Sequence, residues 1–265
     1  MNENQNPYAN PDAAIAPTPE DPANAKALRK SRPYGFWLTS LFALIIIVAW
    51  GILQSVVLIV YVQATGGDLT PEAIEAMVMD GFFLGIVTVT TAPAAILFTL
   101  FFAWTRGPGV REYLALRPVS LKTLALWCAI GIAAAVAADY AKYFLDFPVA
   151  STFIEESYRT AGSMVLFATA IVIMAPLWEE ILFRGFVFEG YSRSPVGPAG
   201  AILIPAVIWA AIHMQYEIHD IVTIFVLGIV IGVARWRSGS LYIPIAMHLV
   251  LNSIALISVA LTIDA

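Results

Sequence analysis

The chain has 265 residues, of which 60% are hydrophobic and only 12% are charged. Because soluble globular domains carry roughly 25% charged residues, this composition, with a mean hydropathy of +0.80, excludes a soluble globular enzyme and a wholly disordered chain. A net charge of −5 with scattered Lys and Arg residues provides no basic face for nucleic acid. The single cysteine, Cys128, excludes an intramolecular disulfide framework and a multi-cysteine metal site. The composition predicts a polytopic membrane protein.

The first 35 residues differ from the rest of the chain. They are rich in Asn, Pro and Ala and almost lack large apolar residues after Tyr8, so residues 1–35 are predicted to be a disordered polar N-terminal tail. The apolar run that starts at Phe36 is too long, and too far from the N-terminus, for a cleaved signal peptide. We therefore interpret it as the first transmembrane helix.

Seven apolar runs follow one another between residues 36 and 262, and each is near the roughly 20 residues that a membrane-spanning helix needs. They cover residues 36–61, 81–104, 121–145, 163–190, 198–215, 219–235 and 241–262. The fifth and sixth runs are at the short end of this range. The predicted fold class is all-α, a polytopic transmembrane helical bundle of about seven spans.

The basic residues indicate how the bundle is oriented. With the N-terminus inside, the inner segments hold most of the Lys and Arg residues: Lys26, Arg29, Lys30, Arg32, Arg106, Arg111, Arg117, Lys122, Arg193, Arg235 and Arg237. The outer connections hold mainly acidic residues: Asp68, Glu72, Glu75, Asp80, Asp146, Glu155, Glu156, Glu217 and Asp220. By the positive-inside rule we expect a cytoplasmic N-terminus and an external C-terminus. The absence of an internal repeat weakens a transporter interpretation.

A small set of polar side chains remains deep in the predicted spans, where each charge costs a few kcal/mol on insertion scales. Three helices bring them to overlapping depths, so we expect them to face one polar pocket. The set comprises Glu179, Glu180, Arg184, His213, His248 and Asn252.

Helix geometry suggests a role for each of these residues. Glu180 and Arg184 are four residues apart and can pair on one face, whereas Glu179 is rotated about 100° away. An unpaired carboxylate in a low-dielectric pocket suits a general base, and His213 could orient a water against it or hold a metal. His248 and Asn252 also share a face, and their N–H groups could form an oxyanion site.

Simpler interpretations apply to the other polar or small residues. Taken alone, the Glu180–Arg184 pair would more often be a structural salt bridge, and Asp139 and Lys142 are expected to pair or to extend toward the interface. The neighbouring His219 and Asp220 are expected to lie in a hydrated loop. Gly228 and Gly232 are predicted to allow close packing within the chain.

The pocket residues resemble the three motifs of the CPBP family, which comprises CAAX proteases and bacteriocin-processing enzymes of membranes. The motifs occur in the family's order: Glu-Glu-x-x-x-Arg at Glu179, Glu180 and Arg184; Phe-x-x-x-His at Trp209 and His213, with Trp in place of Phe; and His-x-x-x-Asn at His248 and Asn252. The resemblance covers about residues 160–255, within the bundle of residues 36–262.

The resemblance implies an intramembrane endopeptidase acting on a membrane-associated peptide or protein, with the lipid bilayer as its surroundings. It implies that Glu179 and His213 activate water and that His248 and Asn252 stabilise the oxyanion, with Glu180 and Arg184 supporting the site. The cofactor stays open between Zn²⁺ held by Glu179, His213 and His248 and no metal at all, which we slightly favour on mechanism because the compact His-Glu-x-x-His zinc helix is absent.

The pocket residues are also compatible with two other functions. A non-catalytic immunity or scaffold protein could use the same pocket to bind a partner, and its phenotype would survive alanine substitutions there. A proton-coupled transporter could use intramembrane Glu and His residues as relays. The identity of the substrate, its prenylation and the oligomeric state do not follow from the sequence.

Overall fold

The structure is a computed structural model that describes residues 33–106 and 109–263. All regular secondary structure in these residues is helical. The elements are α2 Phe36–Thr65, α3 Pro71–Met79, α4 Gly81–Thr105, α5 Val110–Tyr113, α6 Leu121–Phe144, α7 Thr152–Arg159, α8 Met164–Ala168, η3 Thr169–Met174, α9 Ala175–Glu180, η4 Ile181–Val187, α10 Phe188–Ser192, α11 Gly197–Ala211, α12 Ile218–Ser238 and α13 Tyr242–Ile263. The predicted N-terminal tail lies outside the described residues, except for residues 33–35, of which Tyr34 is buried.

The prediction of an all-helical integral membrane protein is confirmed. In the described residues, six helices are long and apolar enough to cross a membrane, and one of them runs continuously from Met164 to Ser192 through α8, η3, α9, η4 and α10. The predicted fifth span corresponds to α11, which has only 15 residues. At about 1.5 Å per residue this helix is shorter than the hydrocarbon core of roughly 30 Å.

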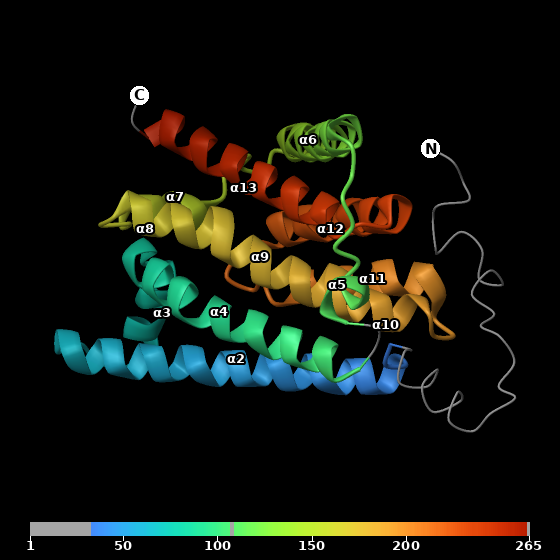
Figure 1. Ribbon diagram of the computed structural model, residues 1–265. Helices are drawn as coiled ribbons and strands as arrows, with labels where there is room; N and C mark the ends of the chain where they lie inside the picture. Colours follow the sequence, from blue (N-terminus) through green and yellow to red (C-terminus); the bar gives the residue numbers. More distant parts are fainter. Residues whose placement is uncertain (1–32, 107–108, 264–265) are drawn as a thin grey trace, which may run out of the picture.

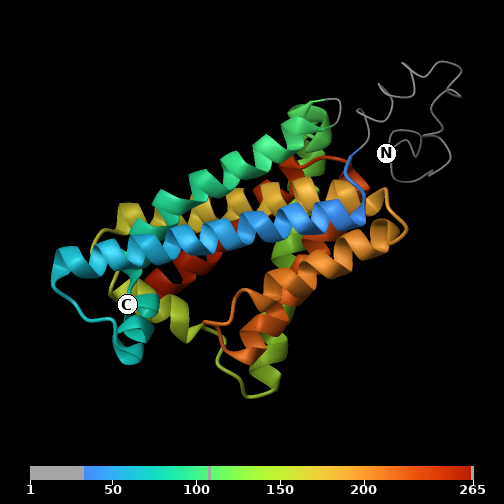
Figure 2. The same cartoon turned by 90° about the horizontal axis from the view of Figure 1, so that it is seen from below.

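The helices lie side by side as an elongated bundle (Figure 1). Helix α4 packs between α2 and the Met164–Ser192 helix, and α6 packs on α12 and α13 at the other edge of the bundle. The view from below shows α2 lying along the bundle with α12 on the far side (Figure 2). Helix α2 begins at one end of the bundle and α13 ends near the other.

Close packing around α12 depends on its two glycines. A Cβ atom on Gly228 would lie 3.0 Å from the Trp209 ring, and one on Gly232 would lie 3.0 Å from Ile202. Both neighbours belong to α11, so the prediction that these glycines serve packing within the chain is confirmed. Helix α11 also packs against η4 and α10, which belong to the helix that carries the acidic motif.

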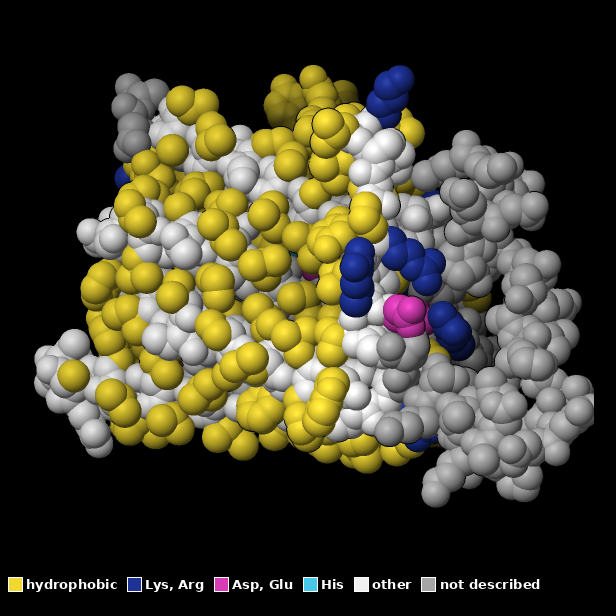
Figure 3. All heavy atoms as spheres, viewed as in Figure 1, with side chains coloured by type: hydrophobic (Ala, Val, Ile, Leu, Met, Phe, Trp, Pro, Cys, Tyr) yellow, Lys and Arg dark blue, Asp and Glu magenta, His cyan; other side chains and the backbone are white. Residues whose placement is uncertain are grey.

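The two ends of the bundle differ in charge. At the end where α2, α6 and α13 begin lie Arg111, Arg117 and Arg193, which are among the residues predicted to be inside; we call this the basic end. The opposite end holds α3, α7 and the start of α12 and is called the acidic end. On the face shown in Figure 3, hydrophobic side chains cover most of the surface, and most visible Lys and Arg side chains gather at the basic end.

Candidate active site

The acidic motif lies on α9, which is flanked by two π-helical segments, η3 and η4. In η3 the N–H of Ala175 bonds to the carbonyl of Ala170, which shifts the register by one residue. The next N–H in this register would come from residue 176, but Pro176 has none. The carbonyl of Ile171 is therefore left for a donor outside its own helix.

Asn252 on α13 supplies that donor. Its Nδ2 atom donates a hydrogen bond to the Ile171 carbonyl at 2.8 Å. An amide NH₂ group has two hydrogens, so this bond fixes the side chain and leaves one N–H free to donate elsewhere. Asn252 thus has a structural contact that the sequence did not indicate.

Glu180 is the centre of a buried charged group. Its Oε1 accepts from Arg184 Nη1 at 2.9 Å, as the i,i+4 spacing predicts, and it also lies 2.9 Å from His248 Nδ1. Glu180 is completely buried and Arg184 is 2% exposed. Arg184 Nη2 donates in addition to the Gly228 carbonyl at 3.2 Å, so this pair joins the acidic motif to both α12 and α13.

Glu179 has a different partner. The indole Nε1 of Trp209 donates to Glu179 Oε2 at 2.5 Å, whereas Arg184 does not pair with it. The backbone carbonyl of Trp209 lies 2.7 Å from His213 Nδ1. Because a carbonyl only accepts, Nδ1 must carry a proton, and in a neutral ring Nε2 is then an acceptor. Trp209 consequently fixes both groups that were predicted to activate water.

The Trp209 side chain occupies the middle of the site. Its ring centroid is 5.3 Å from those of both His213 and His248, with edge-to-face geometry in each case. The Arg184 guanidinium lies 4.6 Å from the centroid of the same ring, a distance typical of a cation–π contact. A phenylalanine at this position could stack but could not donate a hydrogen bond.

Four of the six predicted site residues line one cavity of about 900 Å³: Glu179, His213, His248 and Asn252. Glu180 and Arg184 are not among its lining residues and lie behind it. From the site the cavity extends to the acidic end, where Lys142, Ser151, Asp220 and Thr262 also line it. The structure therefore separates four groups that can meet a substrate from two that support them.

Tyr216, which was not predicted, also lines the cavity. Its ring centroid is 5.7 Å from that of His213, and it lies in the connection between α11 and α12. Burial raises the pKa of Tyr216, and the charges of Glu179 and Asp220 raise it further. The phenol therefore stays protonated at neutral pH and can serve as a hydrogen-bond donor in the cavity.

The prediction that His219 and Asp220 lie in a hydrated loop is wrong, because both belong to α12 and the His219 side chain is only 8% exposed. Asp220 belongs to the first turn of α12, is 6% exposed, and pairs with Lys142 at 3.2 Å. Lys142 also lies 3.3 Å from Asp139, which confirms the predicted pair, and donates to the Val149 carbonyl at 2.7 Å. Burial of a charge is costly, so the contact with Lys142 is what allows Asp220 to lie out of water.

The residues present do not fit a zinc site in this structure. Within residues 33–106 and 109–263, no three His, Cys, Asp or Glu side chains are grouped closely enough to hold a metal ion. Glu179 and His213 each bond to Trp209, and His248 faces Glu180. The three predicted zinc ligands therefore line the same cavity without converging on one point.

A known family model matches the part of the chain that carries the site. Residues 161–254 match the family described as Type II CAAX prenyl endopeptidase Rce1-like. This range contains all six predicted site residues, so the match supports the resemblance to CAAX proteases that the three motifs indicate.

A curated relative matches a similar length of chain. An uncharacterized 24.3 kDa protein of Escherichia coli is 33% identical over 101 residues, which make up 37% of this chain and 46% of that protein. The match thus spans less than half of the relative's length. No solved structure matches the chain.

Proposed function

We propose that the protein is an intramembrane endopeptidase that hydrolyses peptide bonds in membrane-associated peptides or proteins. The observation that carries the proposal is the convergence of Glu179, His213, His248 and Asn252 on one cavity inside a membrane bundle. A base, a second imidazole and an amide donor around one cavity are the groups that peptide hydrolysis requires. The Rce1-like domain supports the same reaction class.

Glu179 and His213 activate the water in this proposal. Trp209 occupies Oε2 of Glu179, so Oε1 is available to a water that also donates to Nε2 of His213. The water oxygen attacks the scissile carbonyl carbon while its proton passes to Glu179. The carbonyl oxygen becomes an oxyanion.

His248 and Asn252 stabilise that oxyanion. The free N–H of Asn252 Nδ2 donates to it, and Nε2 of His248 donates when the ring carries a proton on both nitrogens. The Nδ1 proton of that ring bonds to Glu180, whose carboxylate offsets the positive charge. When the C–N bond breaks, Glu179 returns its proton to the leaving amine, and the products are a new carboxyl terminus and a new amino terminus.

We propose that this reaction needs no metal, because Glu179, His213 and His248 are not grouped closely enough, among the described residues, to hold one. Purified protein is expected to retain full activity after dialysis against a chelator. Loss of activity that returns on addition of stoichiometric zinc would overturn the metal-independent mechanism while leaving the endopeptidase proposal intact.

Comparative peptidomics of membranes tests the function. Cells that produce the wild-type protein are compared with cells that produce Glu179→Ala, and Glu156→Ala on the exposed face of α7 serves as a charge-matched control. We expect cleavage products that are present with wild type and Glu156→Ala and absent with Glu179→Ala. Identical peptides in all three samples, with folded protein in each, would favour the non-catalytic alternative.

A further inference from the structure

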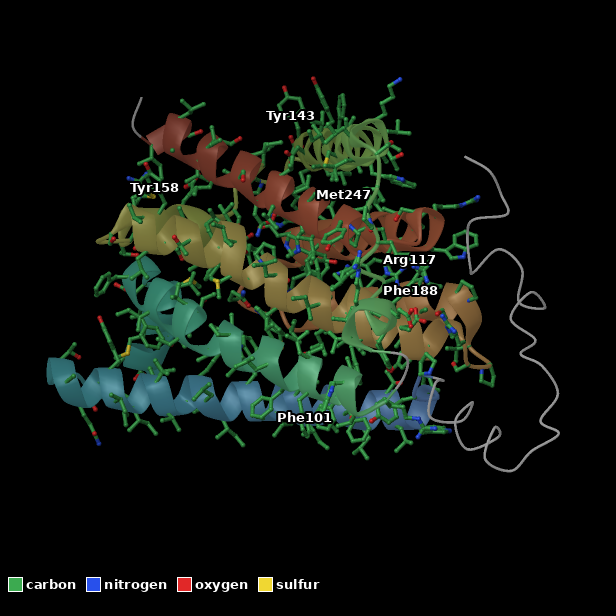
Figure 4. All side chains as sticks on the ribbon, viewed as in Figure 1. Phe101, Arg117, Tyr143, Tyr158, Phe188 and Met247 are labelled. Atoms are coloured by element: carbon green, nitrogen blue, oxygen red, sulfur yellow. The ribbon has the colours of Figure 1, made fainter. Side chains whose placement is uncertain are left out.

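A second pocket lies at the basic end, away from the catalytic cavity. It has a volume of about 470 Å³ and is formed by the segment around α5 and by the end of the Met164–Ser192 helix. Three arginines and two glutamates provide its charges: Arg111, Arg117, Arg193, Glu112 and Glu189. Figure 4 labels Arg117 and Phe188 at this end of the molecule and Tyr158 at the other.

The floor of the pocket is formed by Glu189, a buried carboxylate with two arginine partners. Glu189 is 1% exposed, and its two oxygens lie 2.6 Å from Arg193 Nη2 and 3.6 Å from Arg235 Nη2. Arg235 is completely buried and donates through Nε to the Arg184 carbonyl at 2.9 Å. The negative charge of Glu189 is therefore already matched by Arg193 and Arg235.

The rim of the pocket carries guanidinium groups with spare donors. Arg111 and Arg117 are both exposed. The Nε of Arg111 makes one long hydrogen bond, 3.4 Å to the Leu116 carbonyl, and no described residue pairs with the side chain of Arg117. A guanidinium has five N–H donors in a planar fork that matches the oxygens of a phosphate. Glu112 is the only acidic lining residue besides Glu189, so the rim favours an anion.

The pocket also lies at the level where a membrane places its headgroups. Trp37 in the first turn of α2 is 82% exposed, and Trp104 in the last turn of α4 is 69% exposed, both at the basic end. Exposed Trp residues at the ends of spanning helices mark the membrane–water interface. On the face shown in Figure 3, the hydrophobic surface begins beside the basic end.

We propose that this pocket binds the phosphate group of an anionic phospholipid, held by Arg111 and Arg117 at the rim. Phosphate oxygens accept from both guanidinium forks, and the acyl chains extend along the apolar surface of the bundle. The bound headgroup would lie against α5, the buried Glu189 and the exposed Arg193. Anionic lipid is thus a ligand of the basic end that is independent of the peptidase reaction.

Lipid titrations of the purified protein test the proposal. Native mass spectrometry and thermal unfolding follow the addition of phosphatidylglycerol, phosphatidylcholine or inorganic phosphate to wild type, to Arg111→Ala/Arg117→Ala and to Arg237→Ala. Arg237 is the matched control, because it is exposed at the same end but stacks on Trp236 outside the pocket.

We expect wild type and Arg237→Ala to bind phosphatidylglycerol at least tenfold more tightly than phosphatidylcholine, and the double variant to lose this preference. Equal affinity of wild type for the two lipids, or an unchanged preference in the double variant, would overturn the proposal. Competition by inorganic phosphate at the same concentration would show that the pocket takes free phosphate and would overturn the lipid assignment. Because both arginines are exposed, the double variant is expected to fold, which its unfolding curve without added lipid verifies.

Discussion

At the scale of single residues, Trp209 has the largest effect on how the site is understood. The sequence treats it as a large aromatic residue that replaces the phenylalanine of the second motif. In the structure its indole N–H holds Glu179, its backbone carbonyl holds His213, and its ring separates the two imidazoles. We therefore regard Trp209 as a positioning residue for the base.

The Trp209→Phe substitution tests this role, because it keeps the ring and removes the donor. Loss of a hydrogen bond to a charged group, worth roughly 1.5–3 kcal/mol, predicts a fall in kcat of about ten- to one-hundredfold with little change in KM. The control is Trp50→Phe, which also removes an indole donor at the cavity, in this case to Thr91. Equal effects of the two substitutions on kcat would contradict a specific role for Trp209.

The Glu180–Arg184 pair is the main buried electrostatic contact of the site. Removing Arg184 leaves Glu180 buried with His248 as its remaining side-chain partner among the described residues, and breaking a buried pair in this way costs about 3–5 kcal/mol. Arg184→Ala is thus expected to lower the unfolding temperature in detergent strongly. Arg184→Lys is expected to restore only part of the lost unfolding temperature. Lysine lacks the planar fork with which arginine reaches both Glu180 and the Gly228 carbonyl. A wild-type unfolding temperature in the lysine variant would show that the positive charge alone stabilises Glu180.

Local spacing was sufficient to predict some of these contacts and insufficient for others. The Glu180–Arg184 pair follows from one helical turn, and the shared cavity follows from the scarcity of polar residues at that depth. The contact of Glu180 with His248 joins residues 68 positions apart, and the donor role of Trp209 depends on how α11 rotates against α9. Asp220 was misplaced because its partner, Lys142, lies 78 positions earlier in the chain. Such contacts depend on tertiary packing, which spacing within one helix does not report.

At the scale of elements, the π-helical segments around α9 shape the site. The register shift at η3 and the missing N–H of Pro176 leave the Ile171 carbonyl for Asn252, which ties α13 to the Met164–Ser192 helix beside Glu179. The apolar runs predicted seven helices with ends within a few residues of those observed. They did not reveal η3 and η4, because a π-turn keeps the same residue types and changes only the register.

A double-mutant cycle separates the structural contact of Asn252 from its catalytic role. Asn252→Ala leaves the Ile171 carbonyl unpaired, at an expected cost of about 1–3 kcal/mol in unfolding free energy. Pro176→Ala supplies an N–H within the helix, so in that background Asn252→Ala should cost clearly less. Activity is expected to stay low in both Asn252 variants, because neither restores the oxyanion donor. Additive unfolding free energies would contradict the proposed link between Pro176 and Asn252.

Short helices outside the spans escaped the sequence interpretation for a related reason. Helices α3, α5 and α7 have 9, 4 and 8 residues, and they lie in the connections between spans. Isolated helices of this length are marginal in water, and packing rather than propensity stabilises them. Helix α7 packs closely against α4, where a Cβ atom on Gly81 would overlap the Ser157 carbonyl. Residues of α3 and α7 line the catalytic cavity, and residues of α5 line the pocket at the basic end.

At the scale of the whole molecule, the catalytic cavity extends to the acidic end and the proposed lipid site lies at the basic end. The positive-inside rule predicts that the basic end is cytoplasmic. With a cytoplasmic basic end and a cavity that extends to the acidic end, we expect the substrate to reach the site from the outer side of the membrane or from between the helices. The sequence alone did not indicate where the cavity opens.

Protease protection of tagged protein tests the orientation. A tag after Ala265 is expected to be digested when protease is added to intact spheroplasts, whereas a tag before Met1 is digested only after the membrane is opened. Substitution of Arg111 and Arg117 by Glu would weaken the basic bias and is expected to increase the inverted fraction. An external N-terminus in the wild-type protein would reverse the predicted side of substrate entry.

The most direct test of the central claim follows hydrolysis by the purified protein. Proteoliposomes are incubated in ¹⁸O-water with the precursor of a peptide that depends on Glu179 in cells, and the product is analysed by mass spectrometry. Wild type and Glu156→Gln are expected to give product with ¹⁸O in its new carboxyl terminus, and Glu179→Gln is expected to be at least a thousandfold slower, roughly 4 kcal/mol in activation free energy. Cleavage by Glu179→Gln at the wild-type rate would contradict the account.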